Sequence, residues 1–327
     1  TYVPAEIVDR LVESGEEPKL GGEQVEITAF FSDVQSFSTF SEKLPPEQLV
    51  TLMNEYLGAM TDILDAEGGT LDKYIGDAIV ALFNAPVPIT QHALHGCRAA
   101  VKMQKQQAHL REKWQREGKV WPDIVAQMRT RIGLNTGLAT VGNMGSDKRF
   151  NYTMMGDTVN VAARCESGAK LAGVYTLVTR SVMEGATGTA PVDPAATRLA
   201  TAIEVPESIT SGGDGDALAF RFVDRWILKG RTEPTDMFEV AGTVADLGGE
   251  GLEALAVYHQ GLQRYFQQDF AAARQCFARS AELEPLRPGR DVNITTPASL
   301  IMAQRCQHYA LNPPGNDWDG VHAQTSK

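Results

Sequence analysis

The sequence predicts an α+β fold in which helices cover a mixed sheet, followed by a small α-helical region. Two observations lead to this class. Up to about residue 240, stretches of strand pattern alternate with long stretches of helical period, without a strict strand–helix repeat. After the glycine pair Gly248-Gly249, only helical pattern remains. The length of 327 residues fits about two domains of ordinary size.

Three segments follow from this pattern. Residues 1–23 are expected to form a lead-in helix and linker, residues 24–247 the main α+β domain, and residues 248–327 the helical region. Within the main domain, residues 185–219 are rich in Ala, Thr, Gly, Pro and Asp. This composition predicts a flexible surface excursion.

The first half of the main domain is expected to contain a strand, a long helix and a hairpin. The strand covers residues 25–31. Pro45-Pro46 favours a helix start, where a missing amide hydrogen does no harm, and apolar residues then recur at helical spacing up to Gly68-Gly69. Residues 70–83 form two apolar runs broken by Gly76-Asp77, which predicts a hairpin with its turn at that pair.

The second half of the domain repeats this alternation. Its pattern predicts, in order, a helix over residues 90–118, strands over 128–134 and 138–141, a polar loop over 142–148, a helix over 157–171, and strands over 175–178, 221–228 and 237–240.

Composition excludes several classes of protein. The formal net charge of −11 argues against a general nucleic-acid binder, which needs clustered Lys and Arg. The four cysteines lack the spacing of a zinc site or a disulfide framework, so reduced, buried thiols are expected at Cys97, Cys165, Cys276 and Cys306. No stretch reaches the roughly 20 continuous apolar residues of a membrane span.

Two carboxylates stand where apolar runs end. Asp33 closes the run that begins near Val25, and Asp77 lies in the Gly-Asp break of the predicted hairpin. Magnesium in proteins is usually held by one or two carboxylates together with substrate phosphates. Paired metals stabilise the attacking and leaving oxygens of a displacement at phosphorus. The pair therefore indicates nucleotide chemistry.

Four motifs together resemble the catalytic domain of class III nucleotidyl cyclases. They occur in the family's order over roughly residues 24–240, with no member missing, and are Phe31-Ser32-Asp33-Val34, Lys73-Tyr74-Ile75-Gly76-Asp77, Arg131-Ile132-Gly133-Leu134-Asn135-Thr136-Gly137 and the run from Tyr152 to Arg164. The resemblance implies the ferredoxin-like, palm-type fold of that family. It also implies a head-to-tail homodimer with catalytic sites at the interface between the two copies.

The resemblance assigns the catalytic positions residue by residue. Asp33 and Asp77 match the metal carboxylates, which would hold two Mg²⁺ per site, with Mn²⁺ able to substitute. Asn160 and Arg164 match the transition-state pair. Their spacing of one helical turn independently places both side chains on one face of the predicted helix. A planar guanidinium also suits the oxygens of a phosphoryl group on which charge develops.

Further positions match contacts to the substrate. Arg131 and Lys229 match phosphate-binding residues, and Phe37 is assigned as a third substrate contact. Lys73 and Thr153 match the base-selecting pair. In the family, Lys73 and Asp77 would serve opposite sites of the dimer, so each site would need both copies.

The base-selecting pair predicts ATP as the substrate and adenylyl cyclase as the activity, a phosphorus–oxygen lyase. Lys73 only donates and Thr153 can donate or accept, which suits the ring nitrogen and amino group of adenine. Guanylyl cyclases usually carry Glu and Cys at these two places. Two alternatives stay open, a guanylyl cyclase and a non-catalytic dimerisation module of cyclase type.

Other resemblances concern regulation and the ends of the chain. Thr153 is familiar in a bacterial subgroup that includes bicarbonate-responsive members, which raises bicarbonate modulation as a hypothesis. Residues 251–285 resemble one tetratricopeptide-type helix pair, followed by a third helix over 297–309. The tail over residues 313–320 resembles that of bacterial membrane-anchored cyclases. An upstream sensor and membrane segment are therefore expected, with the catalytic part in the cytoplasm and the full-length protein anchored at the inner membrane.

Overall fold

The computed structural model describes residues 20–146, 148–188, 210–211, 217–228, 233–284, 297–315, 318 and 320–321. The chain divides into two compact units, Thr1–Ser167 and Gly168–Lys327. The division falls inside the segment predicted as the main domain, and the proposed boundaries at 23/24 and 247/248 stay predictions. The lead-in helix and most of the excursion over 185–219 lie outside the described residues.

The first unit is built on an antiparallel sheet. Its strands are β1 (Gly21–Val34), β2 (Thr70–Ile75), β3 (Ala78–Phe83), β4 (Thr130–Ser146) and β5 (Arg149–Met155), in the order β2-β3-β1-β4 with β5 paired to β4. The predicted hairpin is confirmed, because β2 and β3 are joined at Gly76-Asp77 and Gly76 has a φ of 65°. Such a φ favours glycine.

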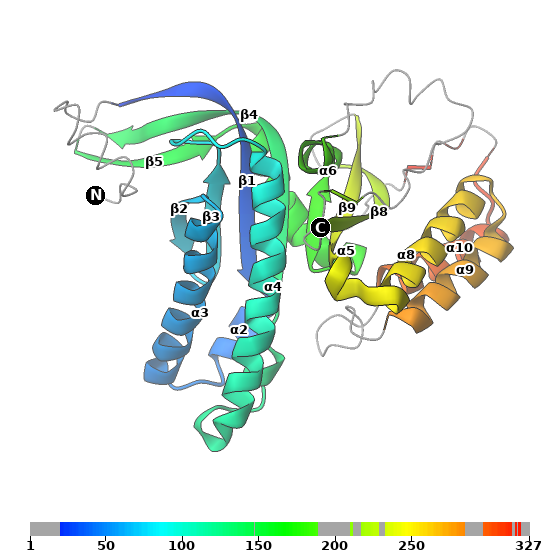
Figure 1. The fold of residues 1–327 in the computed structure, drawn as a ribbon, viewed down its shortest axis with the longest axis horizontal. Helices are drawn as coiled ribbons and strands as arrows, with labels where there is room; N and C mark the ends of the chain where they lie inside the picture. Colours follow the sequence, from blue (N-terminus) through cyan, green and yellow to red (C-terminus); the bar gives the residue numbers. More distant parts are fainter. Residues whose placement is uncertain are drawn as a thin grey trace. The chain divides into compact units, whose positions relative to one another are not determined.

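Helices cover this sheet. They are α2 (Phe37–Ser41), α3 (Pro46–Ala66), α4 (His92–Arg116) and α5 (Asp157–Ala172), with short 3-10 turns over Gly118–Val120 and Val125–Gln127. Figure 1 shows α3 and α4 side by side, and α4 also contacts β1, β3 and β4. Pro46 stands in the first turn of α3, as the sequence predicted. Part of the core is formed by Ile27, Ala29, Val80, Leu82, Ala85, Ala139, Val141, Met154 and Ala162.

The polar loop predicted over residues 142–148 is wrong for most of its length. β4 continues to Ser146 and pairs with β5 as a long hairpin (Figure 1). Glycine explains the difference, because Gly22 lies opposite Gly142 in the β1–β4 register and a Cβ on Gly142 would be 2.2 Å from the Gly21 carbonyl oxygen. A glycine-rich segment that looks like a loop in sequence is therefore a strand that lies very close to its neighbour.

The second unit has its own strands, β6 (Thr176–Thr179), β7 (Thr210–Ser211), β8 (Leu218–Ile227) and β9 (Pro234–Thr243), in the order β6-β9-β8-β7. Helix α6 (Arg180–Thr187) follows β6. The C-terminal helices are α8 (Val244–Phe266), α9 (Phe270–Leu283) and α10 (Ala298–Leu311). The glycine pair Gly248-Gly249, after which the sequence predicted only helical pattern, lies within α8, and the helix is broken at Gly248, which has a φ of 58°. The α+β class, with helices covering the sheet, is confirmed.

The C-terminal helices pack on the sheet of the second unit. Helix α8 contacts β8, β9 and α9, and α9 contacts α10. A Cβ on Gly261 would lie 2.8 Å from the Phe277 ring, so glycine lets α8 and α9 approach closely. Arg305 of α10 donates to both carboxylate oxygens of Asp224 on β8, at 2.9 and 2.8 Å. These contacts join the helical region to the strands, while its likeness to a tetratricopeptide pair stays a prediction.

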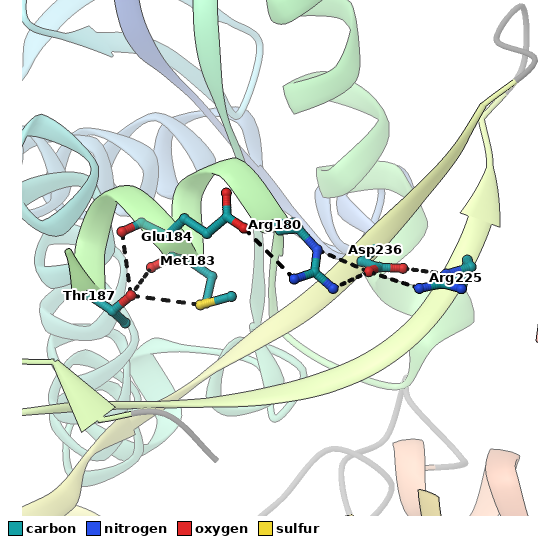
Figure 2. Close-up of polar contacts among 6 residues, drawn as sticks. All are labelled: Arg180, Met183, Glu184, Thr187, Arg225 and Asp236. Carbon is teal, nitrogen blue, oxygen red and sulfur yellow. Dashed lines mark hydrogen bonds and ion pairs between the residues drawn. The ribbon is translucent and has the colours of Figure 1, made fainter. Parts of the chain in front are cut away.

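A buried carboxylate joins three elements of the second unit. Asp236 of β9 accepts from Nε of Arg180 at 3.0 Å and from Nε of Arg225 at 2.6 Å, and its side chain is only 7% exposed (Figure 2). Burial alone would raise the pKa of Asp236, but the two guanidinium groups outweigh this and hold its pKa below the usual value.

We expect Asp236→Asn to lower the free energy of unfolding by about 3 kcal/mol or more, because it removes the buried carboxylate that both guanidinium groups contact. A lowered pKa stabilises the fold fully above the unfolded value near 3.9 and progressively less below it. The difference from wild type should therefore be constant from about pH 5 to 7 and shrink below about pH 4. Urea unfolding across this range measures it.

Glu253→Gln is the matched control, since this carboxylate is 56% exposed and lies 3.8 Å from Arg279. It should change stability by less than about 1 kcal/mol. Equal effects of the two substitutions would contradict the importance given to the Asp236 cluster.

Candidate active site

The two predicted metal carboxylates lie together at one end of the first unit's sheet. Asp33 is near the end of β1, and Asp77 follows Gly76 in the β2–β3 turn. The backbone amide of Val34 donates to Asp77 Oδ2 at 2.9 Å, which fastens the turn to the end of β1. The structure therefore brings together two residues that are 44 positions apart in the sequence.

The electrostatics of this pair favour a bound cation. Burial and, to a smaller extent, the neighbouring charge of Asp33 together raise the pKa of Asp77 to about 6. The hydroxyl of Tyr56 is buried nearby, and its pKa is raised by burial and by the charges of both aspartates. Two carboxylates that repel each other at neutral pH fit the requirement of a divalent metal, which would relieve the repulsion.

Within the described residues, no group of three or more His, Cys, Asp and Glu side chains is arranged to hold a metal ion. Asp33 and Asp77 would therefore supply only part of a coordination sphere. This fits Mg²⁺, which commonly takes one or two carboxylates and completes its shell with water and substrate phosphates.

Arg131 belongs to the same cluster. It lies opposite Asp33 in the β1–β4 register and donates from Nη2 to Asp33 Oδ2 at 2.8 Å. Its Nε donates to Glu166 of α5 at 3.0 Å. Burial raises the pKa of Glu166 to about 7, although Arg131 opposes the rise. We call these four residues, Asp33, Asp77, Arg131 and Glu166, the carboxylate cluster.

Glycine in β4 allows Glu166 to reach this cluster. A Cβ on Gly133 would lie 2.0 Å from the Glu166 amide nitrogen and 2.5 Å from the Ala162 carbonyl oxygen. No side chain fits there, so α5 crosses directly over the strand that carries Arg131. This contact places Glu166, on α5, beside the arginine.

The base-selecting residues form a second group. Lys73 on β2 donates from Nζ to the hydroxyl oxygen of Thr153 on β5 at 3.2 Å. The Thr153 hydroxyl donates to Asp72 Oδ2 at 2.6 Å, and Lys73 Nζ is 3.1 Å from Asp72 Oδ1. We call Asp72, Lys73 and Thr153 the base-contact group. Among the described residues, no hydrogen bond or ion pair joins it to the carboxylate cluster.

Asn160 and Arg164 lie on α5, one turn apart as predicted. Asn160 is exposed and Arg164 is half-buried. Neither side chain makes a hydrogen bond or ion pair with the part of the chain that the structure describes. Both are therefore available to bind a ligand. Their assignment as a transition-state pair stays a prediction.

Two predicted substrate contacts add less. Phe37 is half-buried and is the first residue of α2, which begins shortly after the end of β1 at Val34. Lys229 lies outside the described residues, so its predicted phosphate contact is untested.

All four cysteines belong to the described part of the chain, and none of them is in a disulfide. Three are buried, as expected, whereas Cys276 is half-buried.

Sequence reasoning missed Asp72, Glu166 and Tyr56. Asp72 stands next to Lys73, where regular strand geometry places the two side chains on opposite faces. Glu166 follows Arg164 by only two positions on a helix, and nothing in that spacing predicts a contact with β4. Gly133 was the available signal, because a glycine inside a strand often marks a close approach of another backbone.

Comparison with known proteins decides the family. Residues 22–188 match the family described as the adenylate and guanylate cyclase catalytic domain, which is just over half of the chain. The chain belongs to this family. The match includes every predicted site residue except Lys229.

Two relatives of this cyclase domain are adenylate cyclases. Adenylate cyclase 1 of Rhizobium meliloti is 34% identical over 243 residues, which are 74% of this chain and 31% of that protein. The adenylate cyclase of Anabaena cylindrica is 30% identical over 215 residues, or 65% of this chain and 36% of that protein. The chain thus spans about a third of the length of these relatives.

Solved cyclase structures share the fold. The adenylyl cyclase CyaB from P. aeruginosa has a TM-score of 0.54 at 28% identity, covering 70% of this chain and all of that one (100%). The guanylyl cyclase Cya2 has a TM-score of 0.51 at 29% identity, covering 68% and 95%. The predicted class III cyclase fold is confirmed. Because both kinds of cyclase occur among these likenesses, the choice between ATP and GTP rests on the site itself.

No helix among the described residues is long and apolar enough to cross a membrane.

Proposed function

We propose that this cyclase domain converts ATP into 3′,5′-cyclic AMP and pyrophosphate. The observation that carries the proposal is the contact between Lys73 and Thr153, since the two side chains expected to read the base lie together at 3.2 Å. An ammonium donates to the ring nitrogen of adenine, and a hydroxyl oxygen can accept from the adjacent amino group. Relatives that are adenylate cyclases support the same substrate.

The carboxylate cluster would hold the metal and the phosphates. Asp33 and Asp77 would bind divalent cations, Mg²⁺ or Mn²⁺, two per site. Bound there, such cations supply Lewis-acid polarisation and neutralise charge on the phosphates. Arg131 holds Asp33 in place at 2.8 Å and carries a positive charge into the site, which would attract the triphosphate.

The chain's own cations would stabilise the transition state. In the proposed reaction the ribose 3′-hydroxyl gives up its proton to water and its oxygen bonds to the α-phosphorus, while the bond from that phosphorus to the bridging oxygen breaks and pyrophosphate leaves. Arg164 would donate to the phosphoryl oxygens as charge develops, and Asn160 on the same helix face would orient the ribose. Fixed donors of this kind are the main protein contribution to phosphoryl transfer.

Within the described residues of one copy, no hydrogen bond or ion pair joins the two groups, which fits a composite site. A nucleotide places its base at one end and its triphosphate at the other, whereas the described residues of one copy hold the base-contact group and the carboxylate cluster as unconnected groups. We propose that each nucleotide is bound by the base-contact group of one copy and the carboxylate cluster of the other, in a homodimer with two equivalent sites.

A guanylyl cyclase is the second candidate, since Cya2 shares the fold. Purified protein offered ATP or GTP in parallel, with Mg²⁺ or Mn²⁺, separates the two. We expect cyclic AMP, with kcat/KM for ATP on the order of 100-fold above that for GTP, because mismatched buried hydrogen bonds discriminate strongly. Cyclic GMP as the main product would overturn the proposed substrate, and no cyclic nucleotide with either would favour a non-catalytic module.

A further inference from the structure

An irregularity in the β2–β3 hairpin gives the base-contact group its geometry. Leu71 lies opposite Ala81 and Lys73 opposite Val80, so Asp72 has no partner of its own on β3 and forms a β-bulge. Consecutive residues of a regular strand point to opposite faces. At the bulge, both Asp72 and Lys73 reach the Thr153 hydroxyl. Bulges often re-aim side chains beside functional sites.

The direction of each hydrogen bond in this group is fixed by its chemistry. An ammonium has no acceptor, so Lys73 donates to Thr153. A carboxylate has no donor, so Thr153 must donate its single hydroxyl proton to Asp72. The Thr153 oxygen has two lone pairs, of which Lys73 uses one. Toward a ligand, Thr153 can therefore only accept, and Lys73 can only donate.

Burial keeps this arrangement in place. The Asp72 side chain is 1% exposed, whereas the Lys73 side chain is 40% exposed and open to a ligand. Asp72 Oδ1 makes no hydrogen bond in the described part of the chain and is neutralised only by the Lys73 ammonium at 3.1 Å. A buried carboxylate oxygen without a hydrogen bond is costly, and such exceptions call for an explanation.

We propose that Asp72 is a positioning residue that sets the specificity of the cyclase for the adenine base. By taking the Thr153 proton, it turns the pair into one donor, Lys73, beside one acceptor, Thr153. Adenine presents the complementary acceptor and donor, N1 and the 6-amino group. Guanine presents the reverse, a donor at N1 and an acceptor at O6, and so meets two mismatches. This inference rests on the proposed adenylyl cyclase activity.

The test is Asp72→Asn, which keeps the size of the side chain but adds a donor. An amide can donate to the Thr153 oxygen, which releases the hydroxyl proton to point at the ligand and to accept guanine O6. We expect the ratio of kcat/KM for ATP to that for GTP to fall by roughly tenfold or more, with the GTP value itself rising. Asp62→Asn, at an exposed position of α3, is the matched control and should leave the ratio unchanged.

A double-mutant cycle separates positioning from general structural damage. If Asp72 acts through the Thr153 hydroxyl, Asp72→Asn should have no further effect on the ATP-to-GTP ratio in a Thr153→Val background. An unchanged ratio in the single variant, or the same additional change in both backgrounds, would overturn the inference. Thermal unfolding of each variant shows whether it is folded.

A comparison of substrates on the wild-type protein needs no variant. Inosine triphosphate carries O6 and a protonated N1, while purine riboside triphosphate lacks the 6-substituent and has a free N1. We expect inosine triphosphate to be the poorer substrate by about tenfold or more. Equal turnover of the two would mean that the Thr153 hydroxyl donates freely, against the inference. Absence of cyclic AMP from ATP would instead contradict the proposed function itself.

Discussion

Replacing Asp33 or Asp77 with alanine is expected to lower cyclic AMP formation by about 1,000-fold or more. Loss of a metal carboxylate removes several kcal/mol of charge stabilisation from the transition state, and each 1.4 kcal/mol is about a factor of ten in rate. Both residues lie in the carboxylate cluster, where the charge of Asp33 contributes to the raised pKa of Asp77. Initial rates at saturating ATP and Mn²⁺ measure the effect.

The fold should survive these substitutions. The pKa of Asp77 is raised to about 6 in the folded protein, against a value near 3.9 in the unfolded chain. At pH values above about 6, the ionised carboxylate therefore destabilises the folded state. Removing that carboxylate at pH 8 relieves a penalty, which offsets the loss of the hydrogen bond from Val34. In the Asp33 variant, Arg131 keeps its contact with Glu166 at 3.0 Å. Thermal unfolding checks both expectations.

Asp62→Ala, at an exposed position of α3, is the control and should retain wild-type activity. Full activity in either cluster variant would remove the metal assignment. A large fall in melting temperature together with lost activity would leave Asp33 or Asp77 as a structural residue and would count against a catalytic role.

The order of helices and strands could largely be predicted from the sequence, because local signals fix it. The Pro45-Pro46 start of α3 and the Gly76-Asp77 turn are both local, and both are confirmed. The extension of β4 through residues 142–146 could not be predicted, because its cause is a distant partner strand, with Gly22 opposite Gly142. Gly248 does break the chain's regular structure, but the break lies inside a helix, because α8 begins at Val244 and continues after Gly248 to Phe266.

The candidate site divides in the same way. Asp33, Asp77, Lys73 and Thr153 were found by motif, and the structure brings them together in two pairs. Asp72 could not be found, because its role depends on a β-bulge that changes which way one side chain points. Local spacing carries no information about such a change of register.

The proposed composite site makes a strong prediction for mixed variants. Lys73→Ala removes the base contact from both sites of a homodimer, and Asp77→Ala removes a metal carboxylate from both, so each variant alone should have almost no activity. In a mixed dimer, one site receives both defects and the other receives neither. If each copy instead binds a complete nucleotide by itself, both sites of the mixed dimer carry one defect and neither is intact.

Mixing the two inactive variants is the measurement that tests this account most directly. Lys73→Ala and Asp77→Ala copies with different tags are co-expressed, so that dimers containing one of each can be purified. The purified mixed dimers should form cyclic AMP from ATP at about half the wild-type rate, since one of their two sites is intact, and the unpurified random mixture at about a quarter. Purified mixed dimers that stay as inactive as either parent would contradict a catalytic site shared between two copies.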